Sequence, residues 1–146
     1  MSLENLLKTK QLQSHDPTRE AVQRLLRAAA RNVADARVVK ISSENRFDAA
    51  YKAIMQCAIA ALWANHYRTS TSQPGHHQIA IQTLSKTIGL EQGTVIVLDA
   101  LRKQRNVSDY EGGPVSDQAM NECIRQAEQL YKLVNSWIAT NQPDLT

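Results

Sequence analysis

The residues best suited to chemistry lie in one short stretch, Leu101–Tyr110, which reads Leu-Arg-Lys-Gln-Arg-Asn-Val-Ser-Asp-Tyr. At about 100° per residue, a helix places Arg102, Arg105 and Asp109 on one face, with Asp99 one turn earlier. Guanidinium groups match carboxylates and phosphates through a planar fork of N–H donors. The stretch therefore predicts either an anion-binding face or a row of surface ion pairs, each worth on the order of 0.5 kcal/mol.

The end of this helix is marked by glycine and proline. Gly112 and Gly113 can adopt the left-handed conformation that closes a helix, and Pro114 cannot continue it. We therefore expect the helix to stop soon after Tyr110. If the arginines form only surface ion pairs, Tyr110 is expected to pack over this helix end.

Histidine and cysteine are few, and their spacing predicts no metal site and no cofactor. The chain has no HxxxH pair, no CxxC, no P-loop, no GxSxG and no Gly-rich dinucleotide turn. Cys57 and Cys123 fall among apolar residues and are expected to be buried thiols. His76 and His77 stand where a helix should begin. They are either surface residues or, for one of them, a proton carrier that reaches a shared site.

The composition suits one soluble globular domain that is rich in helix. The chain has 146 residues, of which 42% are hydrophobic and 21% are charged, with only 5 Gly and 4 Pro. The net charge of +3 permits association with nucleic acid or an acidic partner but does not require it. We expect a cytoplasmic protein without membrane contact, because no signal-peptide pattern is visible and the longest apolar run, Cys57–Ala64, is short.

Apolar residues recur at spacings of three and four along most of the chain, which predicts an all-α fold. Start signals for helices stand at Asp16-Pro17, at Ser42 or Ser43, and at Ser116-Asp117. The helix that begins near Glu44 is apolar over most of its circumference and should be central. The expected helices span Leu3–Lys10, Asp16 to about Val38, Glu44 to about Tyr67, about His76 to Ile88, about Glu91 into the Leu101–Tyr110 stretch, and Ser116 to about Thr140.

These helices predict an antiparallel four-helix bundle with one or two additional short helices. Residues 1–146 form a single domain, with short flexible ends at 1–15 and 141–146. The polar segment Arg68–Gly75 is expected to be a loop. The bundle seam of the last helix should consist of Met120, Cys123, Ala127, Leu130, Val134 and Trp137.

A second group of arginines lies on the helix that follows Asp16. Arg24, Arg27 and Arg31 form a stripe away from its apolar face. The stripe is either a solvated helix face or a contact for phosphates or for an acidic partner.

Three strings, in this order and spacing, resemble the HEPN domain, a helical-bundle family associated with nucleotide and RNA biology. They are Asn45–Ala53 at the start of the alanine-rich helix, Pro74–His77 after the polar loop, and Leu101–Tyr110. The resemblance covers about Ser43 to Trp137. It implies a homodimer in which two copies of the arginine-bearing helix meet across a cleft.

The resemblance also identifies a departure from the members that cut RNA. Those members carry an arginine, a polar residue beside it and a histidine a few positions later. Arg105 and Asn106 match the first part, whereas Tyr110 stands about where the histidine would fall. The string Arg-x-x-Ser-Asp-Tyr is similar to a subgroup with Arg-x-x-Ala-Asp-Tyr, whose proteins are often paired with small nucleotidyltransferases. A tyrosine with a pKa near 10 is a poor base at pH 7, which weighs against catalysis.

Three functions follow as hypotheses. The first is a HEPN-like protein that binds a nucleotide or RNA, acting with a nucleotidyltransferase partner in a toxin–antitoxin-type system. The second is a metal-independent ribonuclease that uses Arg105 with Asp109, His76 or His77. The third is a non-catalytic scaffold or neutralising subunit. In the first, the ligand-binding residues from both chains are Arg102, Arg105, Asn106, Asp109 and Tyr110.

Overall fold

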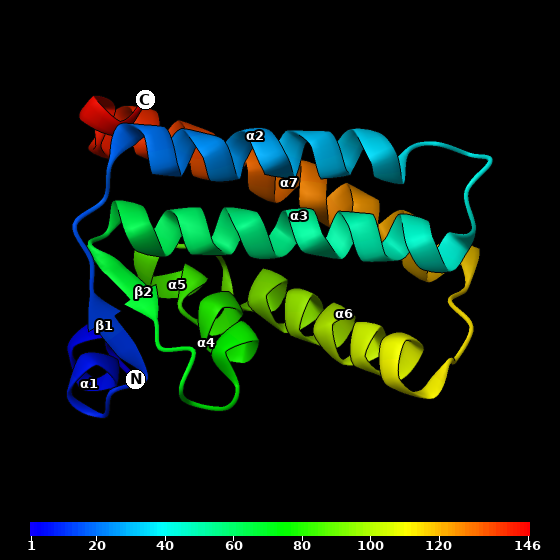
Figure 1. Ribbon diagram of the computed structural model, residues 1–146, viewed down its shortest axis with the longest axis horizontal. Helices are drawn as coiled ribbons and strands as arrows, with labels where there is room; N and C mark the ends of the chain where they lie inside the picture. The colour runs from blue at the N-terminus through cyan, green and yellow to red at the C-terminus, as the bar shows by residue number, and fades with distance from the viewer.

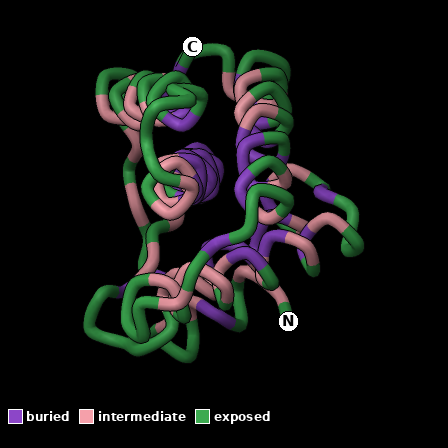
Figure 2. The backbone as a smooth tube through the Cα atoms, turned by 90° about the vertical axis from the view of Figure 1, so that its right-hand side faces the viewer, coloured by how far each residue is buried: buried purple, intermediate pink, exposed green.

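The central helix of the fold is α3 (Ser43–Ala64), which is buried on most of its circumference. The computed structural model describes all 146 residues as a helical bundle with one small two-stranded sheet (Figure 1). In Figure 2, a mostly buried helix lies in the middle of the bundle, and the outer helices turn exposed faces to solvent. The other elements are α1 (Leu3–Lys8), β1 (Leu12–Ser14), α2 (Arg19–Ala36), β2 (Tyr67–Thr69), α4 (His76–Gln82), α5 (Leu84–Thr87), α6 (Gln92–Glu111), α7 (Asp117–Asn141) and a 3₁₀ turn at Pro143–Leu145.

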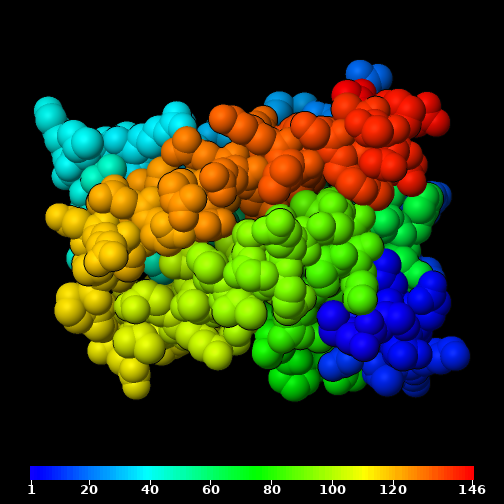
Figure 3. Space-filling view, turned by 180° about the vertical axis from the view of Figure 1, so that it is seen from behind, coloured from blue at the N-terminus to red at the C-terminus, as the bar shows by residue number.

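Alanines allow the neighbours of α3 to pack closely. Ala50, Ala53, Ala58 and Ala61 are fully buried along α3, and α2 and α7 pack against it. α6 and α4 lie against α3 on the side away from α2 (Figure 1). From behind, α7 and α6 form much of the visible surface (Figure 3). The predicted all-α fold is confirmed.

Side-chain caps begin three of the four longest helices, α2, α3 and α7. Ser42 accepts a hydrogen bond from the backbone N–H of Asn45, and Ser116 accepts one from Ala119, as the sequence predicts for both starts. The predicted cap at Asp16-Pro17 is wrong. Thr18 is the N-cap of α2 and accepts from the N–H of Ala21, so the helix begins two residues after the proline.

The small sheet was not predicted. β1 and β2 pair antiparallel, with Leu12 opposite Thr69 and Ser14 opposite Tyr67. β2 occupies residues expected at the end of the central helix and in the following loop. That helix ends earlier, because Asn65 caps it and His66 turns the chain with a left-handed φ of 70°. Strands of three residues are too short to show an alternating pattern in the sequence.

The segment expected as one helix from about His76 to Ile88 forms two. α4 and α5 are separated at Thr83, which is fully buried and whose hydroxyl donates to the carbonyl of Ala80. A hydroxyl that bonds the preceding turn competes with regular helix geometry. The break leaves α4 as a short helix that brings its first residues to the side of α3.

Both chain ends contribute buried side chains. The sequence had led us to expect short flexible ends. Leu6, Leu12 and Leu145 are buried in the core, and the Gln23 side chain donates to the carbonyl of Leu145. The predicted seam of α7 is correct except at Trp137. That ring is half-buried, and Ile138 takes the buried position instead.

None of the helices is both long enough and apolar enough to span a bilayer.

Candidate functional site

Arg105 belongs to α6 and contacts α3, and α4 packs against both of these helices. Its Nε is 2.8 Å from Oδ2 of Asp109, one turn later in α6, and 3.7 Å from Oδ1 of Asp48 in α3. The side chain is 24% exposed. Despite the short contact, the buried Nε–H is not aligned with any acceptor. The guanidinium is therefore held by ion pairs through Nε, and its terminal N–H groups form no hydrogen bond within the chain.

Tyr51 of α3 forms the floor beneath this guanidinium. The Arg105 carbon Cζ lies 5.5 Å from the centre of the Tyr51 ring, within the range of a cation–π contact. Burial raises the pKa of Tyr51 to about 12, although the charges of Arg105 and Arg102 oppose the shift. Tyr51 therefore remains a neutral phenol at pH 7 and does not serve as a base.

His77 joins the same cluster from the first turn of α4. Its Nδ1 and the Tyr51 hydroxyl are 3.3 Å apart and share a hydrogen bond whose donor depends on the ring tautomer. Burial lowers the pKa of His77, and the charges of His76, Arg105 and Arg102 lower it further. The imidazole is therefore neutral at pH 7 and can accept a proton. The structure thus brings together Arg105 and His77, which lie on separate helices.

Arg102, about one turn before Arg105 in α6, is paired with an acidic residue of the same helix. Its Nε donates to Oδ1 of Asp99 at 2.9 Å, and Lys103 lies 3.6 Å from the other oxygen of the same carboxylate. The spacing of the sequence predicts the pairing of Arg102 with Asp99 and of Arg105 with Asp109. Arg102 is thus more fully satisfied within the chain than Arg105 is.

Tyr110 does not pack over the helix end, because its side chain is 79% exposed. It borders an open cavity of about 550 Å³ between the start of α3 and the end of α6. Asp48 and Asp109 line this cavity together with Glu44, so its wall is acidic. Asn106 is half-buried and makes no side-chain hydrogen bond within the chain. Asn106 and Tyr110 are therefore both available to a ligand or a partner.

The end of α6 follows the predicted stop signal. Gly112 has a left-handed φ of 69° and its N–H bonds the carbonyl of Ser108. The chain then turns toward α7, where the N–H of Val115 donates to Glu44 of α3. This hydrogen bond links the turn after α6 to the start of α3, about one helical turn before Asp48.

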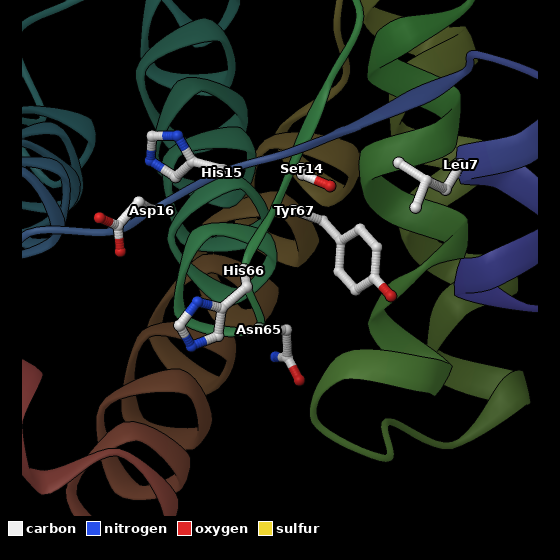
Figure 4. Close-up of a pocket in the computed structure, with 7 residues that line it drawn as sticks. All are labelled: Leu7, Ser14, His15, Asp16, Asn65, His66 and Tyr67. Carbon is white, nitrogen blue, oxygen red and sulfur yellow. The ribbon is translucent and has the colours of Figure 1, made fainter.

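A second open cavity, of about 600 Å³, lies beside the small sheet, away from this cluster. Figure 4 shows its lining, which comes from the end of β1 and the two residues after it, from the turn between α3 and β2, and from Tyr67 and Leu7. His15 of this group packs against Trp63, with ring centres 4.9 Å apart and the ring planes tilted by 43°. No group of three or more His, Cys, Asp and Glu side chains is placed to hold a metal ion. The cysteines are buried free thiols, as predicted, and burial raises the pKa of both to about 12.

The family model of the HEPN domain matches residues 22–137. The chain belongs to the HEPN family. The match runs from α2 to α7 and includes α3, α4 and α6, which carry the Arg105 cluster. Membership implies a nucleotide- or RNA-associated function in general terms. No curated protein matches the chain significantly.

The sequence did not identify two residues of the Arg105 cluster, Asp48 and Tyr51, as candidates for a site. Both lie within the string Asn45–Ala53, which resembles the family but gives neither residue a role of its own. They are three residues apart and so share one face of a helix. The only signal in the sequence is an acidic residue one turn before a tyrosine on an otherwise apolar helix. That signal does not indicate which residue of another helix the two contact.

The pH dependence of stability is expected to reflect two histidines of this HEPN domain. Burial, then the charges of His76 and Arg105, lowers the pKa of His77; burial and the charge of Arg68 lower that of His15. The unfolded chain therefore binds more protons below about pH 6.5, so the free energy of unfolding falls as the pH falls through this range. We expect a lower melting temperature at pH 5.5 than at pH 7.5. His77→Gln should reduce the difference, and an identical pH dependence in the variant would contradict this role.

Proposed function

We propose that this HEPN protein binds a nucleotide or RNA at the Arg105 cluster, with Arg105 as the phosphate contact. The proposal rests on the contacts that the Arg105 guanidinium makes within the chain. Its charge is held beside Asp48 and Asp109, yet it donates no aligned hydrogen bond within the chain. Because Nε is buried, a phosphate oxygen would accept its charge-assisted hydrogen bonds from the terminal N–H groups, which the ion pairs orient before the ligand binds.

The neighbouring residues support a role in binding the rest of a nucleotide. Asn106 can hydrogen-bond a base, a sugar or a phosphate, and the exposed Tyr110 offers a ring for stacking. Asp109 can accept a hydrogen bond from a sugar hydroxyl on the side not facing Arg105. The acidic wall of the adjacent cavity favours the base and sugar there, because phosphates are repelled by Asp48 and Glu44.

HEPN domains often dimerise, and we propose that this one forms a homodimer in which the two α6 helices line one groove. We further propose a small nucleotidyltransferase as partner in a toxin–antitoxin-type system, in the cytoplasm. The homodimer proposal rests on membership of the family, and the partner proposal rests on the string that ends at Tyr110. Light scattering of the protein alone, and mixed with the product of the neighbouring gene, tests them. A monomer that binds no such product contradicts them.

A metal-independent ribonuclease is a second candidate, because His77 lies at the Arg105 cluster as a neutral imidazole. Such a base accepts the proton of a 2′-hydroxyl while the oxygen attacks phosphorus and the 5′-oxygen leaves. The leaving oxygen takes a proton from a second group, and the His76 ring lies 4.8 Å from that of His77. In this candidate, His77 of α4 acts in place of the histidine that α6 lacks.

Incubation with total RNA in EDTA tests this second candidate. If His77 is the base, the native protein should cleave RNA, and His77→Ala should lower the rate about 100-fold or more. His15→Ala is the matched control, since its ring lies in the other cavity. Intact RNA at high concentrations of native protein would exclude the candidate.

The binding proposal itself is tested by equilibrium titration of a short RNA and of nucleoside monophosphates into the native protein and Arg105→Ala. Loss of binding in the variant is the expected result. Equal binding by both proteins would remove Arg105 as the phosphate contact.

A further inference from the structure

The arginines of α2 differ from all the others in the chain. Six arginines lie outside α2, and each has a partner. Arg37 pairs with Glu128, Arg102 with Asp99, Arg105 with Asp109 and Arg125 with Glu122, while Arg46 donates to the carbonyl of Ala36 and Arg68 to Gln13. The four arginines of α2 are all exposed, and none forms an ion pair or a side-chain hydrogen bond. They are Arg19, Arg24, Arg27 and Arg31.

Three of these four form a row along the outer side of α2. Arg24, Arg27 and Arg31 are spaced by three and four residues, and so they point the same way. The buried residues of α2, such as Leu26 and Val33, lie on the opposite side of the helix. At about 1.5 Å of rise per residue, the row is on the order of 10 Å long. Glu20 and Asp35 stand one turn before and after it, and neither pairs with it.

The row is far from the Arg105 cluster. α2 packs on α3 and α7, whereas Arg105 reaches α3 from the side of α4 and α6 (Figure 1). One ligand that touches both must therefore pass around the bundle or belong to a long polymer.

We propose that Arg24, Arg27 and Arg31 form a second contact surface, which binds the phosphate backbone of single-stranded RNA without reading its sequence. Unpaired guanidinium groups in a row suit a chain of phosphates, since each contact releases counterions from the polymer. An acidic protein partner fits this surface less well. Protein interfaces have an apolar centre, and no exposed large hydrophobic side chain lies on α2.

This inference depends on the proposed function only for its choice of RNA as the polymer. It adds that the ligand is longer than a nucleotide, because the two surfaces lie on different sides of α3. The two ideas can fail separately, since a mononucleotide can occupy the Arg105 cluster but cannot span to α2.

The test compares Arg24→Gln/Arg27→Gln/Arg31→Gln with a control of equal charge, Lys8→Gln/Lys10→Gln/Lys86→Gln, whose lysines are exposed and unpaired. Binding of a 30-nucleotide single-stranded RNA is measured by fluorescence anisotropy at several salt concentrations. We expect the arginine variant to bind about tenfold or more weakly, with a salt slope shallower by about 2, and the control to stay near native values.

Several results would overturn the inference. They are native affinity and salt slope in the arginine variant, an equal loss in the lysine control, no RNA binding by the native protein, or competition by poly-glutamate as effective as that by RNA. Nucleoside monophosphate binding is measured in parallel. It should persist in the arginine variant and be lost in Arg105→Ala, so failure at one surface is distinguished from failure at the other.

Discussion

Replacing Phe47 by alanine is expected to lower the free energy of unfolding by about 3–5 kcal/mol. The Phe47 ring is 1% exposed in the first turns of α3, and its carbonyl accepts a weak hydrogen bond from the Cys123 thiol of α7. The small alanines around it cannot expand to fill the space that the ring leaves. For a chain of this size, the melting temperature should drop by about 10 °C or more.

Leu133→Ala is the matched control for this truncation. Leu133 lies on α7 and is 48% exposed, so its removal should change the free energy of unfolding by about 0.5 kcal/mol or less. Thermal denaturation followed by circular dichroism measures both variants. A Phe47→Ala protein that melts within about 2 °C of the native protein would show that α3 is not the centre of the core.

Arg105→Ala is expected to weaken the binding of nucleotide or RNA by about tenfold to 100-fold, because a charge-assisted contact to phosphate contributes about 1.5–3 kcal/mol. The fold should survive, because the group removed is partly exposed and its ion pairs contribute little net stability. Asp48 and Asp109 remain and further repel phosphate once the guanidinium is gone. The measurement is calorimetric titration, with the melting temperature recorded for each protein.

Arg125→Ala provides the control for this second variant. Arg125 is also an arginine paired with a carboxylate, that of Glu122, but it lies on the exposed side of α7. Both variants lose one positive charge. Equal weakening in the two would mean that only the net charge of the protein matters.

Local features of the site could be predicted from the sequence. Spacings of three and four residues on a helix place Arg102 near Asp99 and Arg105 near Asp109, whatever the helix packs against. Gly112 likewise ends α6 through its own backbone conformation. Such features depend on one segment of chain and its known geometry.

Contacts between helices could not be predicted in the same way. Whether Asp48 and Tyr51 face α6 depends on how α3 rotates about its axis, and an apolar helix of many alanines gives little indication of this angle. The contact of His77 with Tyr51 joins α4 to α3, and the break that ends α4 at Thr83 is not visible in the sequence pattern, which continues through that residue. The two strands could not be predicted because each is only three residues long, too short for an alternating pattern.

The pairing of Arg105 with a phosphate is tested most directly by comparing ligands that differ only in the phosphate. Calorimetry with the four nucleoside monophosphates and with the four nucleosides, using native protein, Arg105→Ala and Arg125→Ala, isolates this contact. We predict that at least one monophosphate binds native protein and Arg125→Ala about tenfold or more tightly than its nucleoside, and that Arg105→Ala abolishes the difference. Equal binding of monophosphate and nucleoside by native protein, or a difference that persists in Arg105→Ala, would contradict the account.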